Sequence, residues 1–312
     1  MRILPAIALL LLLAGTAVTQ TQTQDGNRGE IALRALKEGF PERIGEIAFN
    51  GGDWTVMVGG ELFFWAGGKL LPQSELQNAD SYGSYSFYTI PERPADPSSF
   101  SPQYTRLMRE RSGSTQRLAR KDVNPAFQAA LYGGMRRAEV EALQRNVRFL
   151  GFRVNVHSVA VDALKLVEDD IMEWEGAADF IATLGSIGGF SWREIAGTQR
   201  MSYHSMGLAV DIQPRSRGDK PIYWLWESEK NDDWLLVPLE NRWNPPAEVI
   251  EAFRRHGFIW GGNWVSYDNM HFEYRPELLA YTRLVSGNRV SASGSDQAAV
   301  AHHVYPDNLP LR

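Results

Sequence analysis

Residues 202–211 read Ser-Tyr-His-Ser-Met-Gly-Leu-Ala-Val-Asp and contain two candidate metal ligands, His204 and Asp211. Residues 207–212 alternate in a way that is typical of a short, half-buried strand. Zinc accepts imidazole nitrogen and carboxylate oxygen, and a catalytic zinc site usually has three protein ligands and one position open to water. The segment therefore predicts two ligands of such a site and requires another histidine elsewhere.

A second segment, residues 260–274, supplies that histidine. It reads Trp-Gly-Gly-Asn-Trp-Val-Ser-Tyr-Asp-Asn-Met-His-Phe-Glu-Tyr, and Asp268 precedes His271 by three residues. On a turn that enters a strand, this spacing lets His271 bind the metal while Asp268 faces a metal-bound water as a general base. We expect Glu273 to point away from the site if the segment is a strand. The chain has only six histidines, so this joint occurrence is more specific than one buried histidine.

The two segments together resemble a known family. The patterns S-x-H-x-x-G-x-A-x-D and D-x-M-H-F-E, with W-G-G-x-W just upstream, look like the D-alanyl-D-alanine carboxypeptidase and L-alanyl-D-glutamate endopeptidase family of zinc peptidases, in the lysostaphin, D-Ala-D-Ala peptidase and hedgehog fold group. The resemblance covers approximately residues 137–283. It implies that His204, Asp211 and His271 hold one Zn²⁺ and that Asp268 is the catalytic carboxylate. It also implies an α+β fold whose small antiparallel sheet, with flanking helices, carries a mononuclear zinc site.

The resemblance further implies a reaction and a partner. The expected activity is hydrolysis of an amide bond in peptidoglycan stem peptides by Asp268-assisted attack of zinc-bound water. The enzyme would be a D,D-carboxypeptidase or an endopeptidase of the L-alanyl-D-glutamate type, and Asp rather than Glu at position 268 favours the second. The alternative from another class is a catalytically inactive, zinc-bearing module that binds the cell wall. Retention of Asp268 argues against it.

The sequence identifies substrate-binding residues less specifically than it identifies metal ligands. Such families use an arginine to bind a substrate carboxylate or to stabilise an oxyanion, and a planar, permanent cation suits both roles. Arg193 is the candidate, with Arg200 and Arg153 as alternatives. Candidate substrate-binding residues are Ser202, Trp260 and Trp264. Serine beside a ligand is as often a turn residue, and aromatic residues in a glycine-rich loop pack as often as they bind.

The first residues predict export. Residues 1–17 begin with Arg2, continue through the apolar run 3–14 and end in small residues, which is typical of a secretory signal peptide. We expect a periplasmic, cell-wall-associated or secreted protein, with no stable membrane insertion after signal removal. The formal charge of −5 argues against generic nucleic-acid binding. The absence of cysteine excludes disulfides and a thiolate zinc site.

The remainder of the chain divides by composition. Residues 18–100 predict a β-rich accessory region, with a hairpin turn at Gly59-Gly60, and residues 101–136 a basic linker or helical region. The zinc peptidase domain is expected at residues 137–285, followed by a flexible tail at 286–312. Within the domain, the glycine-rich residues 185–197 predict a loop.

Overall fold

The computed structural model describes residues 27–113, 121–195 and 200–292. The expected signal peptide at residues 1–17 lies outside the described residues. The described part of the chain is α+β, with two four-stranded antiparallel sheets, a two-stranded hairpin and surrounding helices.

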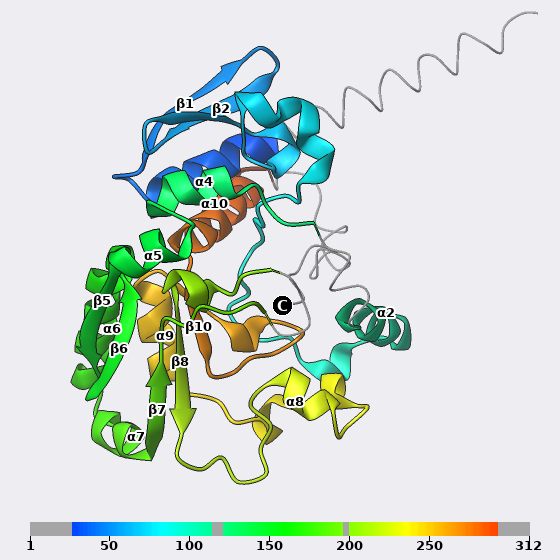
Figure 1. Cartoon of the computed structure of the whole chain (residues 1–312). Helices are drawn as coiled ribbons and strands as arrows, with labels where there is room; N and C mark the ends of the chain where they lie inside the picture. The colour runs from blue at the N-terminus through cyan, green and yellow to red at the C-terminus, as the bar shows by residue number, and fades with distance from the viewer. Residues whose placement is uncertain (1–26, 114–120, 196–199, 293–312) are drawn as a thin grey trace, which may run out of the picture.

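The N-terminal part holds the first sheet, in the order β1-β2-β3-β4, beside a helix over residues 27–39 (Figure 1). Its strands are β1 (Ile44–Asn50), β2 (Asp53–Val58), β3 (Glu61–Phe64) and β4 (Leu71–Pro72). Gly59 and Gly60 join β2 to β3 with φ of +58° and +93°. Glycine adopts these left-handed values without a Cβ clash. The hairpin predicted at this pair is therefore present.

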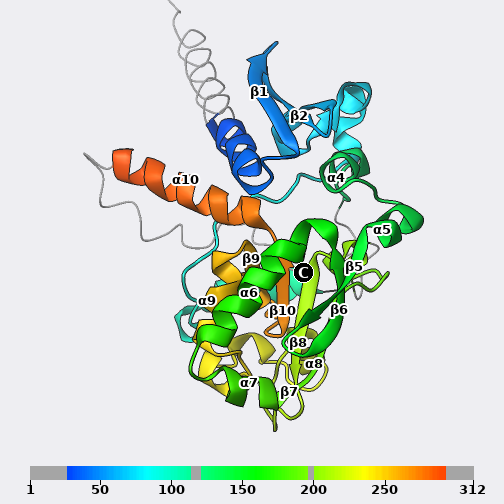
Figure 2. The same ribbon diagram turned by 90° about the vertical axis from the view of Figure 1, so that its left-hand side faces the viewer.

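The second sheet has the order β7-β8-β10-β9 and lies next to the β5–β6 hairpin. Its strands and those of the hairpin are β5 (Gln144–Phe149), β6 (Phe152–His157), β7 (Leu184–Gly188), β8 (Ala209–Pro214), β9 (Phe258–Trp260) and β10 (His271–Tyr274). The α-helices are α2 (Pro102–Ser112), α4 (Pro125–Tyr132), α5 (Arg137–Leu143), α6 (Val161–Glu173), α7 (Ala177–Thr183), α8 (Trp224–Ser228), α9 (Ala247–Arg255) and α10 (Pro276–Ala292). Figures 1 and 2 show α6 and α9 packed on the same side of this sheet.

Short 3₁₀ helices connect these elements. They are η1 (Ala66–Gly68), η2 (Gln73–Ser81), η3 (Pro97–Ser99), η4 (Ser158–Ala160), η5 (Tyr203–Met206), η6 (Trp234–Leu236), η7 (Leu239–Asn241) and η8 (Gly261–Asn263).

The glycine-rich segment at residues 185–197 begins as a strand, so the predicted loop is wrong for its first residues. Leu184–Gly188 forms β7, which pairs antiparallel with β8. A Cβ on Gly185 would lie 3.0 Å from the Cα of Arg215, so glycine here allows the close approach of a neighbouring chain segment. Glycine inside a strand often marks such an approach.

One hydrophobic core joins the N-terminal part to the second sheet. It includes Leu36 and Phe40 near the end of the first helix together with Phe272 on β10. At the same junction, a Cβ on Gly39 would lie 2.6 Å from the backbone nitrogen of Glu277, so no side chain fits. The N-terminal part therefore packs directly against the strand that carries His271.

Helix α10 changes the expected C-terminal boundary. The flexible tail was expected from residue 286, yet α10 continues to Ala292. Ser286, Gly287 and Asn288 are weak helix formers. The helix forms nevertheless, because Leu278 and Ala280 bury its first turns in the core.

Among the described residues, no helix combines the length and the apolar character needed to cross a bilayer.

His157, at the end of β6, gives the fold a pH dependence. Its ring is 2% exposed, Nε2 donates to the Tyr132 carbonyl at 3.0 Å, and Nδ1 accepts from the Val159 N–H at 3.1 Å. Burial, with a backbone bond opposing it, lowers its pKa from 6.5 to about 4. Between those pH values the unfolded chain binds a proton that the folded chain does not, so stability falls as pH falls.

We therefore expect a His157→Gln variant to lose less stability than the wild type between pH 6.5 and 4. The difference should be about 3 kcal/mol, because one pKa unit corresponds to about 1.4 kcal/mol. Urea denaturation at a series of pH values measures it. Parallel stability curves for the two proteins would show that His157 titrates normally in the fold.

Candidate metal centre and active site

Two neighbouring strands and one turn assemble the predicted ligands. β10 pairs antiparallel with β8, and His271 lies directly opposite Asp211. His204 lies in η5, which ends at Met206 and is capped by Gly207 just before β8. Gly207 has φ +70°, and a Cβ there would lie 2.0 Å from Oε1 of Gln144. Only glycine therefore allows the turn that brings His204 back over β8.

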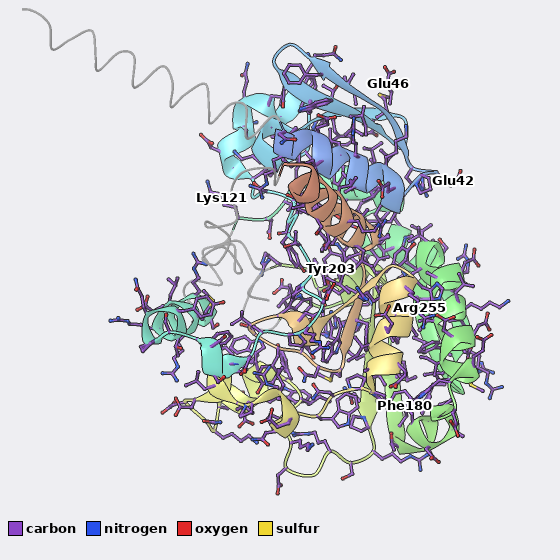
Figure 3. The ribbon with its side chains drawn as sticks, turned by 180° about the vertical axis from the view of Figure 1, so that it is seen from behind. Glu42, Glu46, Lys121, Phe180, Tyr203 and Arg255 are labelled. Atoms are coloured by element: carbon purple, nitrogen blue, oxygen red, sulfur yellow. The ribbon has the colours of Figure 1, made fainter. Side chains whose placement is uncertain are left out.

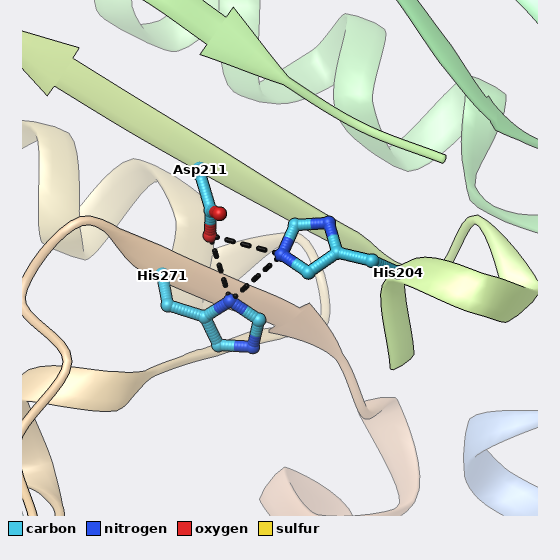
Figure 4. Close-up of side chains that lie close together, drawn as sticks. All are labelled: His204, Asp211 and His271. Atoms are coloured by element: carbon cyan, nitrogen blue, oxygen red, sulfur yellow. Dashed lines mark hydrogen bonds and ion pairs between the residues drawn. The ribbon is translucent and has the colours of Figure 1, made fainter. Parts of the chain in front are cut away.

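The three side chains meet at one point (Figure 4). Oδ1 of Asp211 lies 2.8 Å from Nδ1 of His271 and 3.0 Å from Nε2 of His204. The two imidazole nitrogens are 3.2 Å apart. Zinc bonds of 2.0–2.1 Å in a tetrahedron separate neighbouring ligand atoms by about 3.3 Å. The observed spacing is close to that value, so these residues fit a zinc ion.

The outer ring nitrogens explain why a cation suits this cluster. His204 Nδ1 lies 2.7 Å from the Gly189 carbonyl oxygen, and His271 Nε2 lies 3.0 Å from Oε1 of Glu273. A carbonyl and a carboxylate only accept, so each outer nitrogen carries a proton. If both rings are neutral, the other two nitrogens, His204 Nε2 and His271 Nδ1, carry no proton. Their lone pairs then point toward each other and toward Asp211. That arrangement is repulsive unless a metal ion or an extra proton supplies positive charge.

The pKa values of the cluster reflect the same demand. Burial disfavours protonated His271, but hydrogen bonds to Asp211 and Glu273 outweigh it and raise its pKa to about 10. Burial also disfavours ionised Asp211, yet His204 and His271 hold its pKa well below the usual value. A metal ion would compete with the proton for this position.

Glu273 contradicts the expectation that it points away from the site. It is 1% exposed and accepts from His271 Nε2. The reason is strand periodicity, since residues i and i+2 of a strand face the same side. A carboxylate that holds the outer nitrogen of a metal-binding histidine fixes the ring and increases its basicity. The sequence carries this signal in His-Phe-Glu, because residues two apart in a strand share a face.

Asp268 lies in the loop before β10, beside the cluster. Its backbone N–H donates to the Gly261 carbonyl at 3.1 Å. Its Oδ1 is buried and accepts no hydrogen bond from the described residues. Burial, opposed by His271 and reinforced by Asp211, raises the pKa of Asp268 to about 7. A carboxyl group with a pKa near neutrality is suited to take up and return a proton.

Asp211, His271 and Asp268 line a cleft of about 290 Å³. Its lining includes Arg193, Ser202 and Trp264 from the predicted contacts, but not Arg200 or Arg153. Arg193 is exposed and opposes the raised pKa of Asp268, as a nearby cation should. The structure therefore places Arg193, of the three arginines considered, in the cleft.

The serine and the tryptophans have different roles. Ser202 Oγ caps η5 by accepting from the His204 N–H at 3.3 Å. The Trp264 ring centroid lies 5.6 Å from that of His271. Trp260 does not line the cleft; it is 6% exposed and its Nε1 donates to the Asn269 carbonyl at 2.9 Å. Trp260 is therefore a packing residue, because the inward face of β9 turns it into the core.

Further cleft residues come from a segment that the sequence did not single out. Tyr223, Trp224 and Trp226 line the cleft. Trp226 is 47% exposed and packs edge-on against Tyr223, with ring centroids 5.4 Å apart. The signal was an aromatic run, Tyr-Trp-Leu-Trp, which core packing would explain equally well. Only the position of Trp226 at the cleft makes it a candidate contact for substrate.

Comparison with known proteins points to the same segment. Residues 196–274 match a family described as D-alanyl-D-alanine carboxypeptidase. The peptidoglycan L-alanyl-D-glutamate endopeptidase CwlK of Bacillus subtilis is 35% identical over 80 residues, which are 24% of this chain and 40% of that protein. The part of this chain that matches therefore spans less than half the length of that relative.

The comparisons also concern the N-terminal region and the fold. Residues 32–87 match a family described as a domain of unknown function. No solved structure matches the chain. The resemblance carried by the two motifs is confirmed, because the segment that holds His204, Asp211, His271 and Asp268 matches the D-alanyl-D-alanine carboxypeptidase family and is similar to part of CwlK.

Proposed function

We propose that this protein is a zinc-dependent peptidase that hydrolyses an amide bond in the stem peptides of peptidoglycan. The observation that carries the proposal is that His204 Nε2 and His271 Nδ1 both face Asp211. Beside them lies the carboxyl group of Asp268, whose pKa is raised to about 7. The cluster offers three ligand atoms, the number that catalytic zinc sites use, and two of its residues, Asp211 and His271, line the cleft.

Each residue of the site has a separate role in the proposed reaction. A zinc ion held by His204, Asp211 and His271 would polarise a carbonyl and acidify a water molecule. Asp268 takes the proton of the attacking water and returns it to the leaving amine. Arg193 places a permanent positive charge where a substrate carboxylate or a developing oxyanion would lie. Gly189 and Glu273 keep the two histidine rings in the ligand orientation.

The substrate class follows from the relatives rather than from the cleft. The matched family is described by a carboxypeptidase activity on D-alanyl-D-alanine, and CwlK is named an L-alanyl-D-glutamate endopeptidase of peptidoglycan. Within this class we favour the endopeptidase, because Asp occupies position 268 and the curated relative carries that name. Export is proposed with it, since the wall lies outside the cytoplasm and residues 1–17 have the pattern of a signal peptide.

Incubation of the purified protein with defined muropeptides, with and without a zinc chelator, tests the proposal. Mass spectrometry should show cleavage that the chelator abolishes and added zinc restores. An internal cut identifies the endopeptidase, and loss of a terminal D-alanine identifies the carboxypeptidase. A folded, zinc-loaded protein that cleaves neither bond would contradict the proposal and leave a wall-binding module.

A further inference from the structure

A series of buried polar side chains runs from the metal centre to the N-terminal part. His271 Nε2 lies 3.0 Å from Glu273 Oε1, and Glu273 Oε2 lies 3.9 Å from Arg275 Nη1. Arg275 Nε donates to Glu277 Oε1 at 2.5 Å. The same oxygen of Glu277 accepts from the Tyr85 hydroxyl at 3.0 Å. Four contacts therefore connect a candidate ligand to a residue of the region that matches a domain of unknown function.

Every member of this series is removed from solvent. Arg275 is 1% exposed, Glu277 0% and Tyr85 4%. The guanidinium lies between two aromatic faces, 5.3 Å from the ring centroid of Tyr85 and 5.0 Å from that of Tyr203. Figure 3 shows Tyr203 in the middle of the molecule, between its two parts. Buried charges are strongly destabilising without their partners, so each group here depends on the next.

The geometry of Arg275 decides which partner Glu273 binds. Glu273 lies between two candidate partners, the imidazole of His271 and the guanidinium of Arg275. Glu277 engages Nε of Arg275, and the Ser86 carbonyl accepts from Nη2 at 3.3 Å. Nη1 therefore stays 3.9 Å from Glu273, which is beyond hydrogen-bond distance. Glu273 consequently keeps its Oε1 on His271.

The segment that contains Tyr85 also contacts a residue of the cleft wall. Trp264 Nε1 donates to the Tyr88 hydroxyl at 3.3 Å, and Tyr88 is buried. Trp264 lines the cleft beside His271. Residues 85–88 thus support both a cleft wall and the carboxylate behind a candidate ligand.

We propose that the N-terminal part, through residues 85–88, is a positioning element of the metal centre. Tyr85 acts on His271 through Glu277, Arg275 and Glu273, and Tyr88 acts on Trp264. This function rests on the metal site of the proposed peptidase and not on its substrate. Through Tyr85, it assigns a role at the metal centre to the region that matches a domain of unknown function.

Replacing Tyr85 with phenylalanine tests the proposal in the full-length protein. The change removes only the hydroxyl that holds Glu277 and leaves the ring over Arg275. We expect zinc to bind about tenfold more weakly, the lower end of the range for residues that support metal ligands. Competition with a chromophoric chelator measures the dissociation constant. The absorption spectrum of the Co²⁺-substituted protein should shift as well, because the His271 ring is less firmly held.

Tyr82→Phe is the matched control. Tyr82 also donates from its hydroxyl to a glutamate, Glu75, at 2.9 Å in the same part of the chain. Among the described residues, this pair forms no hydrogen bond to a member of the series. The Tyr82→Phe protein should bind zinc like the wild type. Glu277→Gln removes the charge that holds Arg275 and should weaken zinc binding by up to about 100-fold, with melting temperature followed in parallel.

The outcomes separate this proposal from the proposed function. A Tyr85→Phe protein that melts earlier but binds zinc with unchanged affinity and an unchanged cobalt spectrum would leave Tyr85 a purely structural residue and overturn the positioning role. Wild-type protein that binds no zinc would overturn the metal centre itself and the inference with it. Normal zinc binding without muropeptide cleavage would contradict only the proposed reaction.

Discussion

Replacing His204 with alanine is expected to abolish zinc binding and amide hydrolysis together. In the proposed site the ring supplies one of three ligand atoms, and its Nε2 lies 3.0 Å from Asp211 and 3.2 Å from Nδ1 of His271. Loss of a direct ligand should exceed the 10- to 100-fold effect of residues that only support ligands. Zinc content by atomic emission and the chelator-competition dissociation constant measure the loss. Activity should fall to background at ordinary zinc concentrations.

A second histidine provides the control for that result. His256, directly after α9, hydrogen-bonds Asp170 of α6 at 2.9 Å, and neither residue lines the cleft. His256→Ala should retain zinc and activity. Full zinc content in the His204→Ala protein would remove His204 from the ligand set, and the metal would then have to be sought elsewhere in the chain.

Replacing Asp268 with asparagine is expected to separate metal binding from turnover. The side chain keeps its shape but loses the carboxylate that accepts the proton, and general acid–base catalysis usually contributes about 10²- to 10⁴-fold. We expect kcat to fall by that factor, while zinc content and the dissociation constant for zinc stay near the wild-type values. Steady-state cleavage of a defined muropeptide, with zinc analysis of the same sample, measures both.

Asp219→Asn is the matched change at an exposed aspartate outside the cleft, and it should leave kcat unchanged. If Asp268→Asn cleaves at the wild-type rate, Asp268 is not the base of the reaction. Loss of zinc from the Asp268 variant would instead make this residue a ligand, and the division between the aspartates would have to be reversed.

The two aspartates of the cleft, Asp211 and Asp268, are expected to have different roles. Asp211 lies between two imidazoles, which hold its pKa low and keep it ionised, the form that a metal ligand requires. Asp268 has a buried oxygen without a hydrogen-bond partner among the described residues, and burial raises its pKa to about 7. Two aspartates on neighbouring segments thus acquire different chemical roles from their surroundings.

The sequence by itself determined the residue types of the centre and the local elements that carry them. The spacing of His204 and Asp211 across a glycine predicts a turn entering a strand, and η5, Gly207 and β8 have that order. Such features are local, because a turn and a strand depend on residues close in the chain. The donor set followed from chemistry, since few histidines were available and zinc accepts only certain atoms.

Tertiary structure alone decided which of these side chains meet and what supports them. The register of β10 on β8 sets His271 opposite Asp211, and packing turns Trp260 into the core while Trp264 faces the cleft. The contact between Tyr85 and Glu277 joins residues 192 positions apart. Periodicity shows which face of an element is buried but not which distant segment covers it, because that choice belongs to the packing of the whole core.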